Sequence, residues 1–506
     1  MYIMELLARQ KDNDSTALIY GDKRVTYKEM YNAVLAISHE LAAQSEKYRS
    51  IGLFINNSVN YVKAYFAITF TGHVIVPISP RIKAGELVST ILYCELGVIV
   101  TDTSNMEQLR KELREIQYLI KVFNMDTLAF EEVGKTAFLP VSGGNELDEV
   151  ALMLHTSGSL SLPKRVMLTH KNLVSCAEAI IESLGITKTD RTLIALPLFL
   201  ASANTSQMLT HIYLGASMVI LDTMFTAGYF FKLTERHIVT NFTGVPYMMR
   251  LLTENTNMQQ CDISSLRFIC FGGAPTPLEI IHNLMTAFPA IQCIHMYGQT
   301  EASTRISHLL PGMAAAKAGS VGKPLPGMEC KLADSEGRSV EAGEVGEVLV
   351  KGLNVMKGYY KRAELTSQTV TDGWLHTGDL GRYDEDGFLY IVGRNKNVII
   401  KGGMNIYPEE IEEVLCMHPD VKEAYVFGEK DELLGEVPVA EVVLKNYEIH
   451  ITINDLMKYC IDNLSSYKLP KEIIPVSQLP RTETGKILRI GSGKNYSREL
   501  NVIISK

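Results

Sequence analysis

The chain has 506 residues, of which 46% are hydrophobic and 21% charged, as is typical of globular proteins with more than one domain. Its 49 basic and 57 acidic residues give a net charge of −8 without a long basic run, so nucleic acid is not an expected partner. No apolar stretch suits a membrane span or a signal peptide. Eight scattered cysteines without a CxxC pair predict neither a zinc site nor disulfides, and they favour a cytoplasmic location.

The N-terminal third alternates short apolar strands with amphipathic helices. A hairpin is expected around Gly21, followed by a helix whose first turn carries the capping pair Thr26 and Glu29. The strands expected next are 50–55, 74–77 and 97–101, with helices from Val59 to Thr71 and from about Ala84. This alternation predicts a parallel sheet covered on both faces.

Polar or glycine-rich turns follow three further predicted strands. The first strand, 150–154, leads into the loop 155–165, which is rich in hydroxyls and ends in lysine and arginine. The other two strands end in the turns 272–275 and 297–301, and a helix to Leu184 and a strand at 192–197 lie between. Because ligands gather at the carboxyl ends of parallel strands, we expect a binding site where these turns meet.

The last third of the chain has shorter predicted segments with more frequent glycine. From about residue 318, short glycine-rich segments predict a small antiparallel β unit, and after Lys396 a helix opening at Pro408 begins a compact α+β cap. We therefore predict an α/β fold with a large N-terminal domain, residues 1–395, of parallel or mixed sheets with helices plus the small β unit. A small, mobile α+β C-terminal domain, residues 396–506, follows.

Seven of these segments resemble, in order, the motifs of the adenylate-forming superfamily, which contains acyl-CoA synthetases, carrier-protein adenylation domains and firefly luciferase. The segments are the loop 156–165, Gly272–Pro275, Tyr297–Glu301, Trp374–Asp379, Gly393–Arg394 with Lys396, Gly402–Gly403, and Lys486. A single serine-rich loop is more often a solvated turn. Seven motifs in the family's order, covering nearly the whole chain, are highly specific.

The resemblance implies a site for ATP, Mg²⁺ and coenzyme A. It assigns catalysis to Lys486, Thr300 and Glu301, with Mg²⁺ on Glu301, and it makes Lys396 the hinge and Gly402 and Gly403 the thiol-tunnel turn. The implied ATP- and AMP-binding residues are Thr156, Ser157, Gly158, Ser159, Lys164, Gly273, Ala274, Pro275, Tyr297, Gly298, Thr300, Asp379, Arg394 and Lys486. Positive charge suits this chemistry, because a carboxylate must be brought to the ATP α-phosphate while pyrophosphate leaves.

The resemblance also implies an acyl pocket, formed by Phe199, Leu200, Phe242, Gly244, Val245, Phe271, Gly272 and Met296. Family members that activate α-amino acids carry an aspartate in the segment around Leu200, since a buried ammonium without a counter-ion is costly. No acidic residue stands in this pocket set, so we expect an uncharged alkyl or aryl tail, that is, a fatty or aromatic acid.

The chain departs from the family pattern at several positions. Leu160, Ser161 and Arg165 replace a hydroxyl residue and two glycines of the phosphate loop, which predicts a stiffer loop. His295 stands where many members carry glutamine. The segment 491–494 resembles the end of a Walker A loop, but Leu488 stands where the first glycine of that loop belongs, so we discard it.

The expected function is a carboxylic acid:CoA ligase that forms an acyl-adenylate and releases pyrophosphate. Its partners are a small-molecule acid and CoA. Three alternatives share the motifs. They are a stand-alone adenylation enzyme that loads an acyl or peptidyl carrier protein through its phosphopantetheine arm, a luciferase-like oxygenase, and a weakly active nucleotide-binding homologue, suggested by the altered loop.

Overall fold

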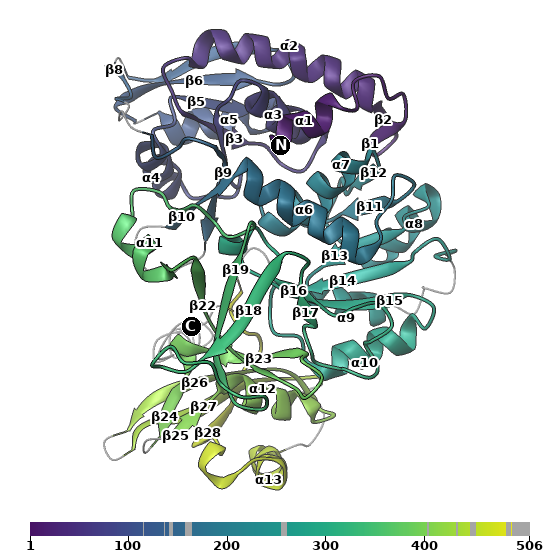
Figure 1. Ribbon diagram of the computed structural model, residues 1–506, viewed down its shortest axis with the longest axis vertical. Coiled ribbons are helices and arrows are strands. Elements are labelled where there is room, and N and C mark those ends of the chain that lie inside the picture. Colours follow the sequence, from purple (N-terminus) through teal and green to yellow (C-terminus); the bar gives the residue numbers. More distant parts are fainter. Residues whose placement is uncertain are drawn as a thin grey trace, which may run out of the picture.

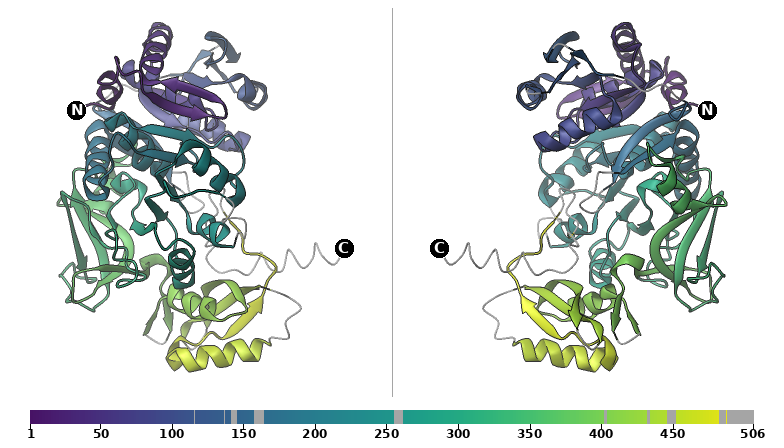
Figure 2. Two further views of the ribbon diagram at one scale, coloured as in Figure 1. Left: turned by 90° about the vertical axis from the view of Figure 1, so that its right-hand side faces the viewer. Right: turned by 90° about the vertical axis from the view of Figure 1, so that its left-hand side faces the viewer.

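The computed structural model describes residues 1–114, 116–135, 137–140, 145–156, 164–254, 261–401, 404–431, 434–445, 452–481 and 487. Four β-sheets organise the chain, and most helices pack on the first two (Figure 1). The predicted α/β class is confirmed. The fourth sheet and its helices lie at the end of the molecule opposite α2, as the side views show (Figure 2).

The first sheet forms the middle of the molecule. In spatial order it contains β17 (Lys323–Pro324), β16 (Ser307–His308), β15 (Gln292–Tyr297), β14 (Phe268–Gly272), β13 (Asn241–Gly244), β11 (Arg191–Ile194), β12 (Ser217–Ile220), β1 (Thr16–Tyr20) and β2 (Lys23–Thr26). The six central strands, from β15 to β1, are parallel. Their carboxyl ends therefore share one edge of the sheet.

The second sheet lies beside the first, toward α2. It contains β20 (Gly358–Tyr359), β10 (Lys164–Thr169), β9 (Val150–Thr156), β4 (Val74–Pro77), β3 (Ser50–Phe54), β5 (Val98–Thr101), β6 (Tyr118–Asn124) and β7 (Ala129–Gly134), with β8 (Ala137–Phe138) beside β6. The predicted strands around 50–101 are confirmed as its parallel core. Sequence analysis missed β10, which pairs antiparallel with β9 and turns the expected long loop into a hairpin.

Two smaller sheets follow in the chain. The third contains β18 (Met328–Ala333), β19 (Gly346–Gly352), β22 (Trp374–Tyr383) and β21 (Val370–Thr371), with β23 (Leu389–Arg394) beside β22. The fourth contains β25 (Met404–Ile406), β24 (Ile399–Lys401), β27 (Gly435–Leu444) and β26 (Val421–Asp431), with β28 (Glu472–Pro475) beside β27. One sheet thus ends at Arg394 and the next begins at Ile399, on either side of the expected hinge residue Lys396.

The helices cover the sheets and bury their apolar faces. They are α1 (Ile3–Ala8), α2 (Tyr27–Ser45), α3 (Val59–Phe70), α4 (Ala84–Cys94), α5 (Thr103–Leu113), α6 (His170–Leu184), the π-helix Ser202–Leu209, α7 (Thr210–Leu214), α8 (Ala227–His237), α9 (Pro246–Thr253), α10 (Leu278–Ala287), α11 (Ala363–Thr369), α12 (Pro408–Met417) and α13 (Ile453–Asn463). The predicted capping box at the start of α2 is confirmed, since Thr26 Oγ1 accepts from the Glu29 amide and the Glu29 carboxylate accepts from the Thr26 amide.

Candidate active site

The turns expected to bind nucleotide meet at one edge of the first sheet. β13 ends at Gly244, β14 at Gly272 and β15 at Tyr297, and these parallel strands are immediate neighbours. Ligands of parallel sheets gather at the carboxyl ends of the strands, so we expect polar function in the residues that follow these ends.

Asp379 is the buried acceptor at this edge. Its side chain is 4% exposed, and its two oxygens are held by different strands: Tyr297 Oη donates to Oδ2 at 2.7 Å, and Arg394 Nε lies 2.7 Å from Oδ1. Burial, and then the Asp379 charge, raise the pKa of Tyr297 well above its ordinary value. Tyr297 therefore remains a donor, and each carboxylate oxygen keeps a lone pair that could accept from a ribose hydroxyl.

Glu301 lies in the short 3₁₀ turn Thr300–Ala302 that follows β15. Tyr359, on β20, donates from its hydroxyl to Glu301 Oε1 at 2.9 Å, and the ammonium of Lys164 lies 5.1 Å from the centre of the same ring. Tyr359 thus brings together an acidic and a basic residue that the sequence had placed in separate motifs. Sequence analysis missed Tyr359, whose one local signal is the aromatic pair Tyr359 and Tyr360 after Gly358.

Two glycines allow the strand ends to approach each other. A Cβ on Gly272 would lie 2.1 Å from the Met296 carbonyl oxygen, and a Cβ on Gly298 would lie 2.0 Å from the Thr304 carbonyl oxygen. Thr304 itself has φ of 101°, an uncommon conformation for a non-glycine residue. The neighbouring Gly273, with φ of 79° and no atom within 4 Å of an added Cβ, begins the open turn toward Ala274 and Pro275.

The expected phosphate loop is the tip of the β9–β10 hairpin. The backbone of Thr156 pairs with that of Lys164, and residues 157–163, which include Ser157, Gly158 and Ser159, lie outside the described residues, as does the side chain of Thr156. Placing Arg165 in the loop was wrong. It belongs to β10, its side chain is buried, and Nη2 donates to Thr90 Oγ1 at 2.6 Å.

The expected acyl-pocket residues lie on four neighbouring segments. Phe199 and Leu200 precede the π-helix and are half-buried, like Val245 and Met296. Phe242 and Phe271 are fully buried: Phe242 packs against Phe225 and Phe230, and Phe271 stacks on His295 with ring centres 5.1 Å apart. These two rings therefore belong to the buried core next to the half-buried residues of the expected pocket.

Arg305 is a charged neighbour of this pocket that sequence analysis missed. It is 1% exposed, and its Nη2 lies 2.8 Å from the sulfur of Met296. Its Nε and Nη1 have no hydrogen-bond partner among the described residues. Burial, and then the Arg305 charge, lower the pKa of His308 to about 3, and no carboxylate of the described residues forms an ion pair with this guanidinium. A buried cation without an anion is costly and calls for a ligand or water.

The hinge and thiol-tunnel predictions fall partly outside the described residues. Lys396 lies in the 3₁₀ turn Asn395–Asn397 between β23 and β24. Gly402, Gly403 and Lys486 are among the residues that the structure does not describe.

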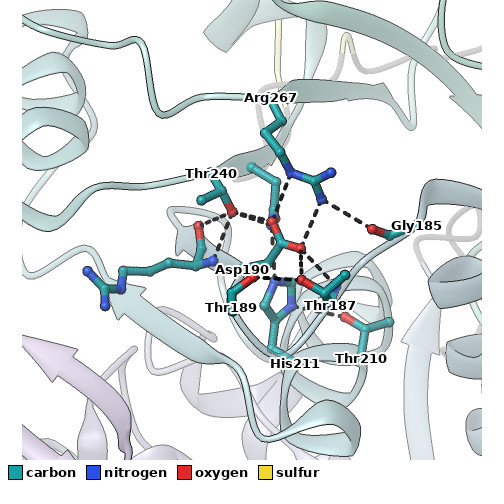
Figure 3. A network of polar contacts seen from close by, with 10 residues as sticks. Gly185, Thr187, Thr189, Asp190, Thr210, His211, Thr240 and Arg267 are labelled. Carbon is teal, nitrogen blue, oxygen red and sulfur yellow. Dashed lines mark hydrogen bonds and ion pairs between the residues drawn. The ribbon is translucent and has the colours of Figure 1, made fainter.

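A network of polar contacts lies at the opposite edge of the first sheet (Figure 3). Asp190 accepts from Arg267 Nε and Nη2 at 3.0 and 2.9 Å, and from Thr240 Oγ1 at 2.6 Å. These residues join the amino ends of β11, β13 and β14. The network holds strand starts together, away from the turns that face the candidate site.

Glu301 fits the binding of magnesium with a nucleotide. The described residues contain no group of three or more His, Cys, Asp or Glu side chains arranged for a metal. Mg²⁺ usually takes one or two carboxylates, with phosphate oxygens and water as its other ligands, rather than an all-protein cage. A single carboxylate beside the predicted phosphate loop is therefore what this ion needs. In the described part of the chain, no helix is long and apolar enough to cross a membrane.

Comparison with known proteins decides the family. The model for the family "AMP-binding enzyme" matches residues 6–360, and that for "AMP-binding enzyme C-terminal domain" matches residues 410–486. The chain belongs to the AMP-binding enzyme family. It is similar to the 2-succinylbenzoate–CoA ligase of Bacillus subtilis (35% identical over 94% of this chain and 93% of that one) and to the feruloyl-CoA synthase of Amycolatopsis (33% identical over 94% of each).

A solved structure of the o-succinylbenzoate CoA synthetase of Bacillus subtilis, in complex with its acyl-adenylate intermediate, superposes with a TM-score of 0.84 at 33% identity. The match covers 96% of this chain and 97% of that one. Another structure of that enzyme contains ATP and a magnesium ion. Together, the family and the similarity to named CoA ligases identify the chain as an AMP-forming acid–thiol ligase, which uses ATP, Mg²⁺ and CoA to activate a carboxylic acid as an acyl-adenylate and then to transfer the acyl group to a thiol.

Proposed function

We propose that the chain converts an aromatic carboxylic acid that carries a second acceptor group into its CoA thioester. The names of the two curated relatives contain an aromatic acid. The expected pocket offers half-buried apolar side chains at Phe199, Leu200 and Val245 and no acidic side chain for an ammonium.

The guanidinium of Arg305, which is buried and has no ion-pair partner among the described residues, is the observation that supports a second acceptor group on the acid. Its contact with Met296 places it beside the expected pocket, where a carboxylate or carbonyl on the far end of the acid could accept from Nε or Nη1. This refines the expectation of an uncharged tail. 2-Succinylbenzoate, named for the Bacillus relatives, has such a group.

The residue roles proposed for the reaction come from the family resemblance, and the contacts of Asp379 and Glu301 support two of them. Asp379, supported by Tyr297 and Arg394, binds the ribose hydroxyls, and Glu301 holds Mg²⁺ near the phosphates. Thr156, Ser157, Ser159, Thr300 and Lys164 bind phosphate oxygens, and the turn Gly273–Pro275 borders the adenine. Lys486 neutralises the carboxylate and the α-phosphate as they approach, which lowers the electrostatic cost of joining two anions.

We further propose a boundary at Lys396 between residues 1–395 and 396–506. The change from the third sheet to the fourth, between Arg394 and Ile399, supports it. Rotation about this hinge would remove Lys486 and bring Gly402 and Gly403 to the acyl group for the thiol step. The similarity to named CoA ligases favours CoA over a carrier protein as the thiol bearer. The cytoplasmic location also stays a prediction.

Pyrophosphate release across a panel of acids tests this function. We expect 2-succinylbenzoate and other aromatic acids with a second acceptor to be preferred over benzoate and fatty acids, and α-amino acids to be inert. Arg305→Met should lower kcat/KM for 2-succinylbenzoate by about 10–100-fold, the value of a charged hydrogen bond, with a smaller effect on benzoate. Equal loss on both acids would contradict a role for Arg305 in recognition.

A further inference from the structure

Ion pairs join the fourth sheet to α9 of the N-terminal part. One carboxylate oxygen of Glu423, on β26, lies 3.2 Å from Arg250 Nη1 and 2.5 Å from Arg481 Nη2. We call Arg250, Glu423 and Arg481 the Glu423 triad. The side chains of Arg250 and Glu423 are each only 15% exposed, so water screens this pair less than a surface pair.

Arg481 and Ile487 flank residues 482–486, which include Lys486 and lie outside the described residues. The backbones of Arg481 and Ile487 form an antiparallel bridge. Ile487 packs against the apolar cluster around Tyr425. Both flanking residues are therefore attached to β26, Arg481 through Glu423 and Ile487 through the cluster that contains Tyr425.

On its other side, the triad is connected to the candidate active site through α9. α9 begins directly after Val245, one of the expected acyl-pocket residues. The ring of Tyr247 lies 5.8 Å from the guanidinium carbon of Arg481, and Arg250 follows three residues later on the same helix. Tyr247 and Arg250 therefore lie on the same face of α9, the face next to Arg481 and Glu423, because residues i and i+3 are neighbours on a helix.

We propose that Glu423 is a positioning residue for acyl-adenylate formation, because it ties Arg481, which flanks the segment with Lys486, to α9, the helix that follows Val245 of the expected acyl pocket. Without the carboxylate, Arg250 and Arg481 would be two like charges close together and would repel, which moves Arg481 away from α9. The thiol step needs no lysine at this position. The inference rests on the role of Lys486 given above under the proposed function.

Glu423→Gln tests the inference, because it keeps the size of the side chain and removes its charge. We expect acyl-adenylate formation at saturating substrates to slow by about tenfold, and thioester formation from a supplied acyl-adenylate to change by less than about twofold. Arg250→Gln combined with Glu423→Gln should be no slower than Glu423→Gln alone, since both remove one interaction.

Glu279→Gln is the matched control. Glu279, on α10, pairs with Lys445 at 3.0 Å and also joins the C-terminal part to the rest of the chain, but both side chains are more exposed, and among the described residues neither forms an ion pair with Arg481. We expect this variant to run both half-reactions at the wild-type rate. Equal slowing of acyl-adenylate formation by the two variants would mean that any contact between the C-terminal part and the rest of the chain has this effect. That result would overturn the specific role of Glu423.

Hydrogen–deuterium exchange without substrates gives a second readout. Glu423→Gln should raise exchange in the peptide that contains residues 481–487, whereas Glu279→Gln should not. Unchanged exchange, or equal loss of both half-reactions with a lower unfolding temperature, would overturn the inference. Lys486→Ala distinguishes failure of this inference from failure of the proposed function. If Lys486→Ala forms the acyl-adenylate at the wild-type rate, the proposed role of Lys486 is wrong. If Lys486→Ala is inactive in acyl-adenylate formation and Glu423→Gln is unaffected, only the positioning role of Glu423 is wrong.

Discussion

Asp379 shows how burial and pairing prepare a single carboxylate for binding. Tyr297 and Arg394 approach it from β15 and β23, and its own strand, β22, fixes its backbone. The partners on both oxygens hold the side chain in one orientation before the nucleotide arrives. Such preorganisation reduces the entropy lost on binding.

Asp379→Asn should therefore weaken ATP binding while leaving the fold intact. An amide cannot accept on both of its atoms, and it leaves Arg394 without its anion. We expect KM for ATP to rise by about 10–100-fold, from the loss of a charged hydrogen bond. Pyrophosphate exchange against ATP concentration measures this. Asp384→Asn is the control, because Asp384 pairs with Lys317 at the far end of β22. An unchanged KM for ATP would contradict the ribose role.

His295 should make the stability of the protein sensitive to acid. Burial lowers its pKa to about 4, below the ordinary 6.5, although Nδ1 lies 3.0 Å from the Ser320 carbonyl oxygen. The folded state thus resists protonation that the unfolded chain accepts near pH 6.5. This contribution to stability is complete above about pH 6.5 and is lost as the pH falls toward 4.

His295→Gln should remove part of this loss of stability at acidic pH. Between pH 7.5 and 5.0 we expect the free energy of unfolding of the variant to fall by about 1–2 kcal/mol less than that of the wild type. Urea unfolding at the two pH values measures the difference. His282→Gln, at an exposed position on α10, is the control. An identical pH dependence in wild type and His295→Gln would contradict the burial argument.

At the scale of elements, the β9–β10 hairpin decides which residues of the phosphate segment can touch a nucleotide. The two strands pair up to Thr156 and Lys164, so Arg165 is a strand residue. Its side chain points into the interior toward Thr90 on α4, and its carbonyl oxygen accepts from the Tyr360 amide. Arg165 thus links β10 to α4 and to the residue that follows β20.

Arg165→Gly should accordingly affect stability and not ATP affinity. Loss of a buried side chain and its hydrogen bond in a strand should cost about 2–4 kcal/mol. Ser161→Gly, inside the loop, should change KM for ATP instead. Denaturant unfolding and pyrophosphate exchange on the two single variants separate these effects. A changed KM for ATP in Arg165→Gly at wild-type stability would return Arg165 to the nucleotide site.

The sequence predicted most elements because their signals are local. Alternating strands and helices around residues 50–101 and the capping pair of Thr26 and Glu29 needed no knowledge of distant contacts. The missed features depend on residues far apart in the chain. β10 becomes a strand through β9 and β20, Tyr359 reaches Glu301 across 58 positions, and the Glu423 triad spans α9, β26 and the C-terminal turn.

For the whole molecule, the proposed mechanism requires two arrangements of the C-terminal part, one for each half-reaction. In the arrangement seen here, Glu423 pairs with Arg250 on α9 and Lys445 pairs with Glu279 on α10. In the proposed mechanism, Lys486 serves the first half-reaction and the hinge at Lys396 serves the change between them. Substitutions at these two positions should thus affect opposite steps.

Lys486→Ala should slow acyl-adenylate formation by about 10²–10³-fold and spare the thiol step from a supplied acyl-adenylate. Lys396→Pro should do the reverse, because a fixed φ restricts the rotation. Single-turnover assays of each half-reaction measure both. The same loss in both steps for either variant would contradict two separate arrangements.

The proposed function is tested most directly by a competition assay followed by one analysis of the products. The chain is incubated with ATP, Mg²⁺, CoA and an equimolar mixture of 2-succinylbenzoate, ferulate, benzoate, a medium-chain fatty acid and phenylalanine, and the thioesters formed are identified by mass spectrometry. The account predicts aromatic acyl-CoA products, with the acid that carries a second acceptor in excess and no phenylalanyl product. A phenylalanyl product in excess, or adenylates without any CoA thioester, would contradict it.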